Sequence, residues 1–384
     1  MLRMIFGITL SALSFSAFAQ EPLKIGLVQS MTGPFNTVGK AVVNGARLYM
    51  QQHGDMVAGR KIQIILKDDT TSPEIAKRVA QELIVNDKVA IIGAGITPSA
   101  LTIAPLVTEA KIATVVMVSG ASITVDRSPY MVRTGFTLGQ SSSVIADWAV
   151  QNGTKKIATI VNDWAPGLEA EAAFKDRISK SSIQIMESLR VPLANPDFAP
   201  FLQRARDLGP DTIFAYFPGN QSGIFAKQFV ERGMDKSGIR LIGPGDLTDD
   251  DELPSMTDAM LGIITALHYS ALHDSALNKA YVKDFEAAYG KRPNFVSLGG
   301  YDGMHLIYEA LKKTGGKTDG DAMLAAMKGM NWESPRGPMS IDPETRDVVH
   351  NEYIRRVEKV NGQLYNVEFA TIEAVKDPVR GAKK

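Results

Sequence analysis

Short runs rich in β-branched residues alternate with longer amphipathic runs from residue 23 onward. The strand-like runs cover residues 24–28, 61–67, 89–92 and 112–118, and the helix-like runs between them cover residues 38–52, 73–85 and 98–110. Alternation of a two-residue period with a helical period predicts parallel sheets that are covered by helices on both faces. No other feature constrains the fold of this chain as strongly.

The same alternation restarts near residues 138–143. The second series has runs at residues 141–151, 156–161, 167–179, 183–191, 198–207, 212–216, 221–232 and 239–242. After residues 261–268 the pattern is mostly helical, and a hairpin is expected at residues 353–357 and 365–370. Two successive series of similar length predict an α/β protein of two doubly wound lobes. A chain of 384 residues also exceeds the roughly 250–300 residues that one hydrophobic core usually holds.

The N-terminus has the pattern of a secretory signal peptide. Arg3 is followed by the apolar run at residues 5–18 and by the small-x-small sequence that ends at Ala19. We expect cleavage after Ala19 and a periplasmic protein. The run is too short for a membrane-spanning helix. The alternative, an N-terminal core helix, requires neither the charged start nor the small-x-small ending.

Charge and cysteine content narrow the function. The chain has 42 basic and 42 acidic residues, so its formal net charge is zero, and it has no cysteine. A polyanion-binding protein needs a basic excess or patch, so nucleic acid is not an expected partner. Without cysteine, the chain can form no disulfide and has no thiol nucleophile.

The loop at residues 91–100 is the first candidate binding element. Ligands of open α/β sheets bind outside the carboxyl ends of strands, where loops lead into helix N-termini. Here Thr97 is a good N-cap and Pro98 suits the first helical position. The hydroxyls of Thr97 and Ser99, with the amides of Ser99 and Ala100 at the positive helix end, could hold a carboxylate. The alternative is plain capping by Thr97.

Further candidates follow other predicted strands. Ser119, Gly120, Ala121 and Ser122 are small and allow close backbone approach to a ligand, although a serine-glycine loop is also a common turn. The first strand leads into residues 29–35, a plausible edge of the same pocket.

The second series places aromatic and acidic residues on equivalent loops. Trp164 and Phe217 could line an apolar pocket, or could instead close the core of the lobe. A third loop, at residues 243–246, carries Gly245 and Asp246.

Enzyme and metal sites are not expected. Pro98 stands where a dinucleotide fingerprint needs its third glycine, and the chain has no phosphate loop or serine-elbow motif. The acidic residues at 246 and 249–252 lack the spacing of a calcium loop and are more simply a helix start. The histidines are scattered, and none forms a zinc-type pair at helical spacing. We predict no catalytic residue, cofactor or metal.

Several segments together resemble a known family. They are residues 25–28 and 31–34, Gly45-Ala46-Arg47, Asp68-Asp69, the Gly93 loop and Arg133-Thr134-Gly135. In order and spacing they resemble the leucine/isoleucine/valine-binding proteins, the periplasmic receptors of branched-chain amino-acid ABC transporters.

The resemblance implies two lobes joined by three crossovers, a ligand in the cleft, and docking of the closed form on a membrane permease. We divide the chain accordingly into residues 20–138 with 268–348, residues 139–267 with 349–375, and a frayed tail at 376–384. A monomer is expected.

Carried over by position, the family's carboxylate-binding serine falls on Thr97. Its next loop falls on residues 119–121, and its aromatic contacts fall near residues 164–166 and 217–219. The tyrosine of amino-acid binders falls on Val38, and the glutamate that pairs with the ligand ammonium falls on Gly245, with Asp246 one place on.

Two ligand classes remain open. Either Asp246 replaces the glutamate and the ligand is a hydrophobic L-amino acid, or the ligand is a carboxylate without an amine, because a buried unpaired ammonium is costly. Trp164 and Phe217 favour an aromatic or 2-oxo carboxylate. A sensor module for a separate receptor and a periplasmic hydrolase are the rival functions, and the hydrolase lacks a nucleophile with its base.

Overall fold

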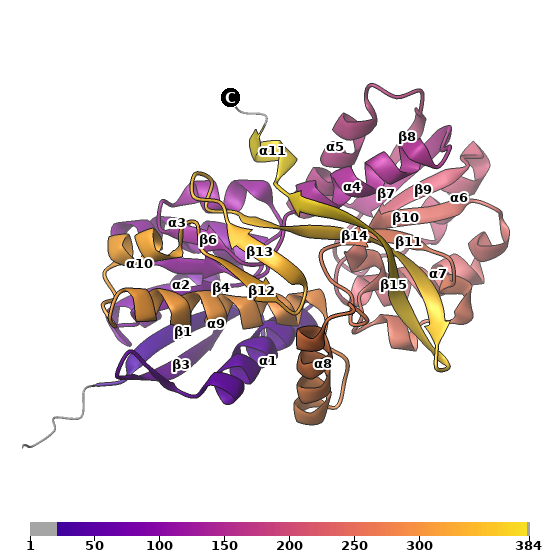
Figure 1. Cartoon of the computed structure of the whole chain (residues 1–384). Coiled ribbons are helices and arrows are strands. Elements are labelled where there is room, and N and C mark those ends of the chain that lie inside the picture. The colour runs from indigo at the N-terminus through magenta and orange to yellow at the C-terminus, as the bar shows by residue number, and fades with distance from the viewer. Residues whose placement is uncertain (1–20, 382–384) are drawn as a thin grey trace, which may run out of the picture.

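The computed structural model describes residues 21–381 and contains two sheets, each covered by helices (Figure 1). The predicted signal peptide and residues 382–384 lie outside the described residues. Within residues 21–381, no helix combines the length and the apolar character needed to cross a membrane.

The first sheet has the strand order β2-β3-β1-β4-β5-β6. Its strands are parallel except for the short β2, and β1 pairs with both β3 and β4. The central strands are continuous apolar runs because helices cover both faces. The bounds are β1 Leu23–Gln29, β2 Met56–Val57, β3 Arg60–Asp68, β4 Ile91–Ala94, β5 Thr114–Val116 and β6 Met131–Arg133.

The second sheet has the order β12-β13-β14-β11-β10-β9-β7-β8, with β15 also paired to β14. The sequence predicted parallel strands, but β12 to β15 are antiparallel to their neighbours. The predicted hairpin is present and longer than expected. The bounds are β7 Lys156–Asn162, β8 Gln184–Val191, β9 Thr212–Tyr216, β10 Arg240–Pro244, β11 Ile264–Leu267, β12 Asn331–Ser334, β13 Gly337–Ile341, β14 Val348–Val360 and β15 Gln363–Val375.

Helices close to each sheet complete the two lobes. The first lobe has α1, α2 and α3, with α8, α9 and α10 added from late in the chain, and α4 to α7 belong to the second (Figure 1). The bounds are α1 Asn36–His53, α2 Pro73–Val85, α3 Thr97–Glu109, α4 Leu138–Gln151, α5 Ala165–Ile178, α6 Ala199–Leu208, α7 Asn220–Glu231, α8 Ala276–Tyr289, α9 Phe295–Lys313 and α10 Gly320–Met327. The predicted two-lobed α/β fold is confirmed.

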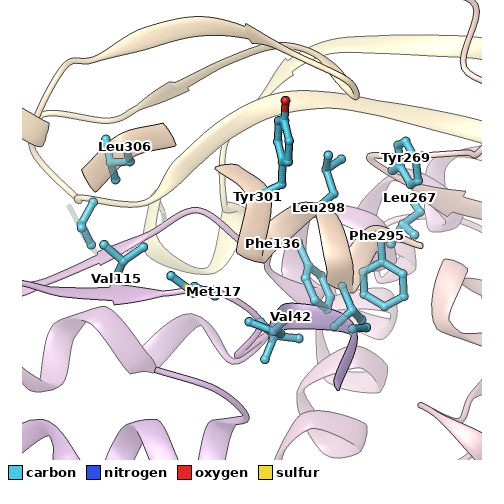
Figure 2. Packing of buried hydrophobic residues seen from close by; sticks show 14 of the residues in the cluster. Val42, Val115, Met117, Phe136, Leu267, Tyr269, Phe295, Leu298, Tyr301 and Leu306 are labelled. Carbon is cyan, nitrogen blue, oxygen red and sulfur yellow. The ribbon is translucent and has the colours of Figure 1, made fainter. Parts of the chain in front are cut away.

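The helix α9 is the centre of the largest apolar core (Figure 2). Leu298 and Leu306 are fully buried, and Phe295 begins the helix beside Phe136. Added Cβ atoms at Gly299 and Gly300 would collide with the carbonyl oxygens of Met117 and Val42. The glycines therefore let α9 lie close to the backbone after β5 and to α1.

Strands β12 and β13 contact both lobes and were not predicted. Hydrogen bonds join them to β14 and so to the second sheet, although our division of the sequence places them in the first lobe. Trp332 in β12 nevertheless donates to Asp302 of α9 and stacks on His305. The lobe boundaries therefore stay a prediction.

Residues 376–381 differ from the frayed tail that we expected. Pro378–Gly381 form the short helix α11, and Arg380 makes ion pairs with Asp347 and Asp126. Asp377 is also buried. These ion pairs anchor the segment to the first lobe.

Candidate ligand-binding site

One cavity lies where strand ends of the two sheets face each other. It has an empty volume of about 460 Å³, part of which opens to solvent. The cavity is lined by Phe35, Val38, Ile96, Thr97, Val118, Ser119, Gly120, Trp164, Pro166, Tyr216, Pro218, Gly219, Asp246, Asp249, Phe295 and Val296.

The first-lobe wall carries a chain of hydroxyls. Thr97 Oγ1 lies 2.8 Å from Ser119 Oγ, which lies 2.8 Å from Thr124 Oγ1. Thr124 in turn donates to the carbonyl oxygen of Ala121. The carbonyl oxygen of Ala121 can only accept. Thr124 therefore donates to Ala121, Ser119 donates to Thr124, and Thr97 donates to Ser119.

Backbone amides supply further donors on this wall. In the described part of the chain, the amides of Thr97, Ser119 and Gly120 make no hydrogen bond. Thr97 is the first residue of α3, so the positive end of the helix adds to them. Amide donors at a helix N-terminus suit a carboxylate, and the hydroxyl of Thr97 adds a donor if it turns from Ser119 to the ligand.

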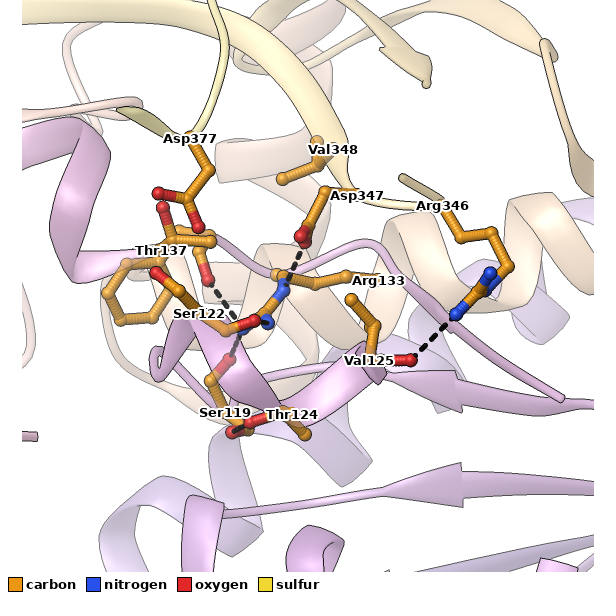
Figure 3. Close-up of polar contacts among 12 residues, drawn as sticks. Ser119, Ser122, Thr124, Val125, Arg133, Thr137, Arg346, Asp347, Val348 and Asp377 are labelled. Atoms are coloured by element: carbon orange, nitrogen blue, oxygen red, sulfur yellow. Dashed lines mark hydrogen bonds and ion pairs between the residues drawn. The ribbon is translucent and has the colours of Figure 1, made fainter. Parts of the chain in front are cut away.

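The loop that carries Ser119 is fixed by a buried arginine (Figure 3). Arg133 at the end of β6 donates to the carbonyl oxygens of Ser119, Ala121 and Phe136, and pairs with Asp347 at 2.5 Å. The guanidinium is fully buried. The planar guanidinium holds the carbonyl oxygens of Ser119 and Ala121 on the side away from the cavity. The amides of Ser119 and Gly120 are then left free to bind a ligand.

Aromatic rings form much of the remaining lining. Trp164 precedes α5 in the second lobe and stacks on Phe35 of the first, with ring centroids 5.3 Å apart. Tyr216, the last residue of β9, and Phe295, the first residue of α9, add two more rings. An apolar or aromatic ligand body fits such a lining.

Two buried acids complete the second-lobe wall. Asp249 accepts from Asn294 Nδ2 at 3.0 and 3.1 Å and from the amide of Asp251. Asp246 has an oxygen, Oδ2, without a hydrogen-bond partner among the described residues. Burial raises the pKa of Asp246 to about 7, although the Arg355 guanidinium opposes the shift. Burial also raises the pKa of Asp249 well above its usual range.

Half of the predicted site residues line the cavity together: Thr97, Ser119, Gly120, Trp164 and Asp246. The predicted capping role of Thr97 is wrong. The N-cap is Ile96, which makes no side-chain cap bond, and Thr97 contacts Ser119 instead. Of the two amides expected to point outward, that of Ala100 donates to Ile96 within the backbone.

Ser99, Ala121 and Ser122 lie behind the first-lobe wall. Ser99 Oγ donates to Asp69 at 2.6 Å, and Ala121 offers its carbonyl to Arg133. The amide of Ser122 donates to Glu169 of α5 across the two lobes.

Phe217 and Gly245 lie in the core of the second lobe. Phe217 is fully buried, with its ring 4.6 Å from that of Phe225. Successive strand residues face opposite sides, so its neighbour Tyr216 reaches the cavity instead. A Cβ at Gly245 would collide with Leu267 and Arg355, so glycine is required there by packing.

Sequence reasoning missed Tyr216, Phe295 and Val296 as lining residues. The sequence contains a signal for Tyr216, because this aromatic residue is the last one of a predicted strand. Phe295 and Val296 enter from the start of α9, far from the other loops in the sequence. The amphipathic run at residues 296–313 predicts this helix, but no local signal places its first turn beside those loops.

Several contacts join the two lobes around the cavity. They include the Phe35–Trp164 stack, the bond from Ser122 to Glu169, the bond from Asn294 to Asp249 and the Lys291–Asp251 ion pair at 2.7 Å. Each pair draws one residue from each lobe. The structure is therefore a closed arrangement of the lobes.

The acidic segment at residues 246–252 does not begin an α-helix. Asp246 lies in the first turn of the short 3₁₀ helix Gly245–Thr248, whereas Asp249 and Asp250 follow that helix and are buried and bonded to Asn294 and Asn366. Hydrogen bonds to neighbouring side chains, and not a helix dipole, therefore stabilise the carboxyl groups of Asp249 and Asp250.

Two of the scattered histidines meet in the fold. His268, His350 and Glu352 are buried, with their nearest polar atoms within 4.8 Å of one another. Arg336, which can only donate, lies 3.3 Å from His350 Nδ1. Nδ1 therefore accepts, and the ring proton is on Nε2, which faces Glu352 at 3.4 Å. The accepting nitrogen of His350 is therefore occupied by Arg336, so in this arrangement His350 offers no free lone pair to a metal ion.

Known proteins share this sequence and architecture. Residues 22–363 match the family model described as periplasmic binding protein. The Leu/Ile/Val-binding protein homolog 6 of Brucella suis biovar 1 (strain 1330) is 39% identical over 373 residues, which are 96% of each chain.

Two solved structures of ABC-transporter solute-binding proteins are also similar. One, from Rhodopseudomonas palustris BisB5 in complex with 3,4-dihydroxybenzoic acid, is 59% identical with a TM-score of 0.93, over 94% of this chain and 100% of that one. The other, from Rhodopseudomonas palustris HaA2 in complex with p-hydroxybenzoic acid, is 39% identical with a TM-score of 0.91, over 95% of this chain and 100% of that one.

Proposed function

Because the chain belongs to the periplasmic binding protein family, of the Leu/Ile/Val-binding type, we propose that it is the solute-binding protein of an ABC importer for an aromatic carboxylate. The ligand occupies the cavity between the lobes. The family implies a periplasmic location, and export with cleavage after Ala19 is part of the proposal.

The aromatic lining of the cavity carries this proposal. The rings of Trp164, Phe35 and Phe295 favour a flat apolar body, and the free amides beside Thr97 and Ser119 favour its carboxylate. The benzoates bound by the two similar Rhodopseudomonas proteins are ligands of this chemistry.

A hydrophobic L-amino acid is the second candidate ligand. Asp246 lies in the cavity with a free oxygen and could pair with an ammonium group, and the curated relative is named for Leu/Ile/Val binding. An aromatic 2-oxo acid belongs with the first candidate, because it has no amine.

Closure of the lobes couples binding to delivery. The carboxylate docks first on the Thr97 and Ser119 loops, and the second lobe then brings Trp164 over the ring. Near-complete closure from a mostly open start needs about 5 kcal/mol of preference for the closed form. A membrane permease that recognises the closed, monomeric protein would then receive the ligand.

A thermal-shift screen of residues 20–384 tests the proposal. A ligand at about a hundred times its Kd stabilises the protein by roughly 2.7 kcal/mol. We expect a raised melting temperature with hydroxybenzoates or phenylpyruvate and none with leucine or valine. A shift with the aliphatic amino acids alone would contradict the aromatic assignment.

Recovery of the ligand separates binding from catalysis. Benzoates incubated with the protein should be recovered unaltered by chromatography, because this chain is proposed to have no catalytic residue. A conversion product would instead support the hydrolase alternative. A thermal shift without transport by a reconstituted permease would favour a sensor.

A further inference from the structure

The side chain of Asp246 is an unused hydrogen-bond acceptor in the cavity wall. It is 3% exposed, and Oδ2 has no partner among residues 21–381. The second acid of the cavity, Asp249, already accepts from Asn294 and from the amide of Asp251. Of these two acids in the described part of the chain, Asp246 is therefore the one with an oxygen that accepts no hydrogen bond.

No neighbouring group among the described residues donates a hydrogen bond to Asp246 Oδ2. Nη1 and Nη2 of Arg355 donate to the carbonyl oxygens of Tyr269 and Gly245 and to the hydroxyl of Thr265, and Nε has no partner, so within the described residues this guanidinium makes no hydrogen bond to Asp246. Tyr216 lines the same wall, and the charge of Asp246 contributes to raising the pKa of the buried Glu352, after burial itself. Leaving a buried acceptor unpaired is unfavourable, so a donor on the ligand would be favoured at this position.

We propose that Asp246 accepts a hydrogen bond from a ring hydroxyl of the ligand, and that the site thereby selects 4-hydroxylated benzoates over benzoate. The inference rests on the proposed function, because it requires an aromatic carboxylate in the cavity.

The position of the hydroxyl follows from the two walls. The carboxylate donors lie on the first lobe, at the start of α3 and after β5, and Asp246 lies on the second lobe, after β10. A benzoate that spans them directs its 4-position away from the carboxylate. A 2-hydroxyl lies beside the carboxylate and would bond to it instead.

The protonation of Asp246 supports the same preference. Burial raises its pKa to about 7, so the carboxyl is partly ionised at neutral pH and more fully ionised as the pH rises. An ionised carboxylate accepts strongly from a phenol, whereas benzoate leaves the buried oxygen of Asp246 without a partner. The hydroxylated ligand therefore gains a hydrogen bond that benzoate cannot make.

Titration calorimetry at pH 7.5 tests the inference with benzoate, 2-hydroxybenzoate and 4-hydroxybenzoate. The wild-type protein should bind 4-hydroxybenzoate at least about 10-fold more tightly than the other two ligands. In the Asp246→Leu variant that preference should fall to about 3-fold or less, because 4-hydroxybenzoate is weakened while benzoate is not. The Asp246→Asn variant keeps a carbonyl acceptor and should retain part of the preference.

Each outcome decides a different claim. Equal binding of benzoate and 4-hydroxybenzoate by the wild-type protein, or an unchanged preference in Asp246→Leu, would overturn the role of Asp246 and leave the proposed function standing. No binding of any benzoate by the wild-type protein would overturn the proposed function and, with it, this inference. Benzoate binding by Asp246→Leu also shows that the variant is folded.

Discussion

The indole of Trp164 stacks on the ring of Phe35, with the two ring planes 14° apart. Phe35 ends the loop after β1 in the first lobe, and Trp164 precedes α5 in the second. The contact therefore forms only when the lobes are closed. It places an aromatic pair at the cavity at the moment when the ligand is enclosed.

Replacing Trp164 should weaken ligand binding. Trp164→Ala removes the stack on Phe35 and part of the cavity wall, and we expect a loss of affinity for hydroxybenzoates of about 10-fold to 100-fold by calorimetry. Trp148→Ala is the matched control, because Trp148 is on α4, outside the cavity lining, and contacts Arg240. Equal losses in both variants would contradict a ligand contact by Trp164.

Replacing Arg133 should affect stability and binding together. Arg133→Gln removes one of the two arginines that pair with the buried Asp347 and leaves Arg380 as its partner, so the free energy of unfolding should fall by less than the about 3–5 kcal/mol that a fully unpaired buried charge costs. It also frees the carbonyls of Ser119 and Ala121, so affinity should fall by about 10-fold or more.

Arg346→Gln separates the two effects of Arg133. Arg346 binds the carbonyls of Met131 and Val125, away from the Ser119 loop. Urea unfolding and calorimetry of both variants should show lost stability in each and lost affinity only in Arg133→Gln. An unchanged affinity in Arg133→Gln would show that this arginine does not position the loop.

The bond between Ser122 and Glu169 should favour closure. The amide of Ser122 donates to Glu169 Oε1 at 2.7 Å, and Glu169 is on α5 of the other lobe. Glu169→Ala should shift the population towards the open form and weaken binding by roughly 5-fold to 10-fold. Glu169→Gln keeps an acceptor and should bind normally. Small-angle scattering should show a more expanded ligand-free Glu169→Ala variant, and identical curves for both variants would refute the idea.

The stability of the protein should depend on the ionisation of Asp246. Burial raises its pKa from 3.8 to about 7, so the wild-type protein loses stability as the pH rises between these values. The total loss is at most about 4 kcal/mol. Asp246→Asn carries no charge, so its advantage in free energy of unfolding should be about 2–3 kcal/mol larger at pH 8 than at pH 5. Urea unfolding of both proteins at pH 5 and pH 8 measures this difference. If Asp246→Asn is stabilised by the same amount at both pH values, ionisation of the buried Asp246 does not lower the stability of the wild-type protein.

The sequence was sufficient for the layers of the fold and for the loops of the first lobe. Alternating periods identify the strands, and strand ends point to Thr97, Ser119 and Gly120 because parallel strands share one binding edge. The antiparallel strands β12 and β13 were missed, since each is short and its pairing with β14 depends on residues distant in sequence.

The direction of individual side chains was harder to predict. Phe217 and Tyr216 are adjacent and both aromatic, and only the register of β9 decides which one reaches the cavity. Ser99 and Ser122 are near the site in sequence, but Asp69 and Glu169 engage them from distant segments. Such long-range partners leave no local pattern, and the same holds for the meeting of His268 with His350.

Calorimetric titration of residues 20–384 with 4-hydroxybenzoate and, separately, with L-leucine decides between the two ligand classes. We expect saturable binding of one 4-hydroxybenzoate per chain and no heat of binding with leucine. Binding of leucine with none of 4-hydroxybenzoate would contradict it, and would mean that Asp246 serves an ammonium group.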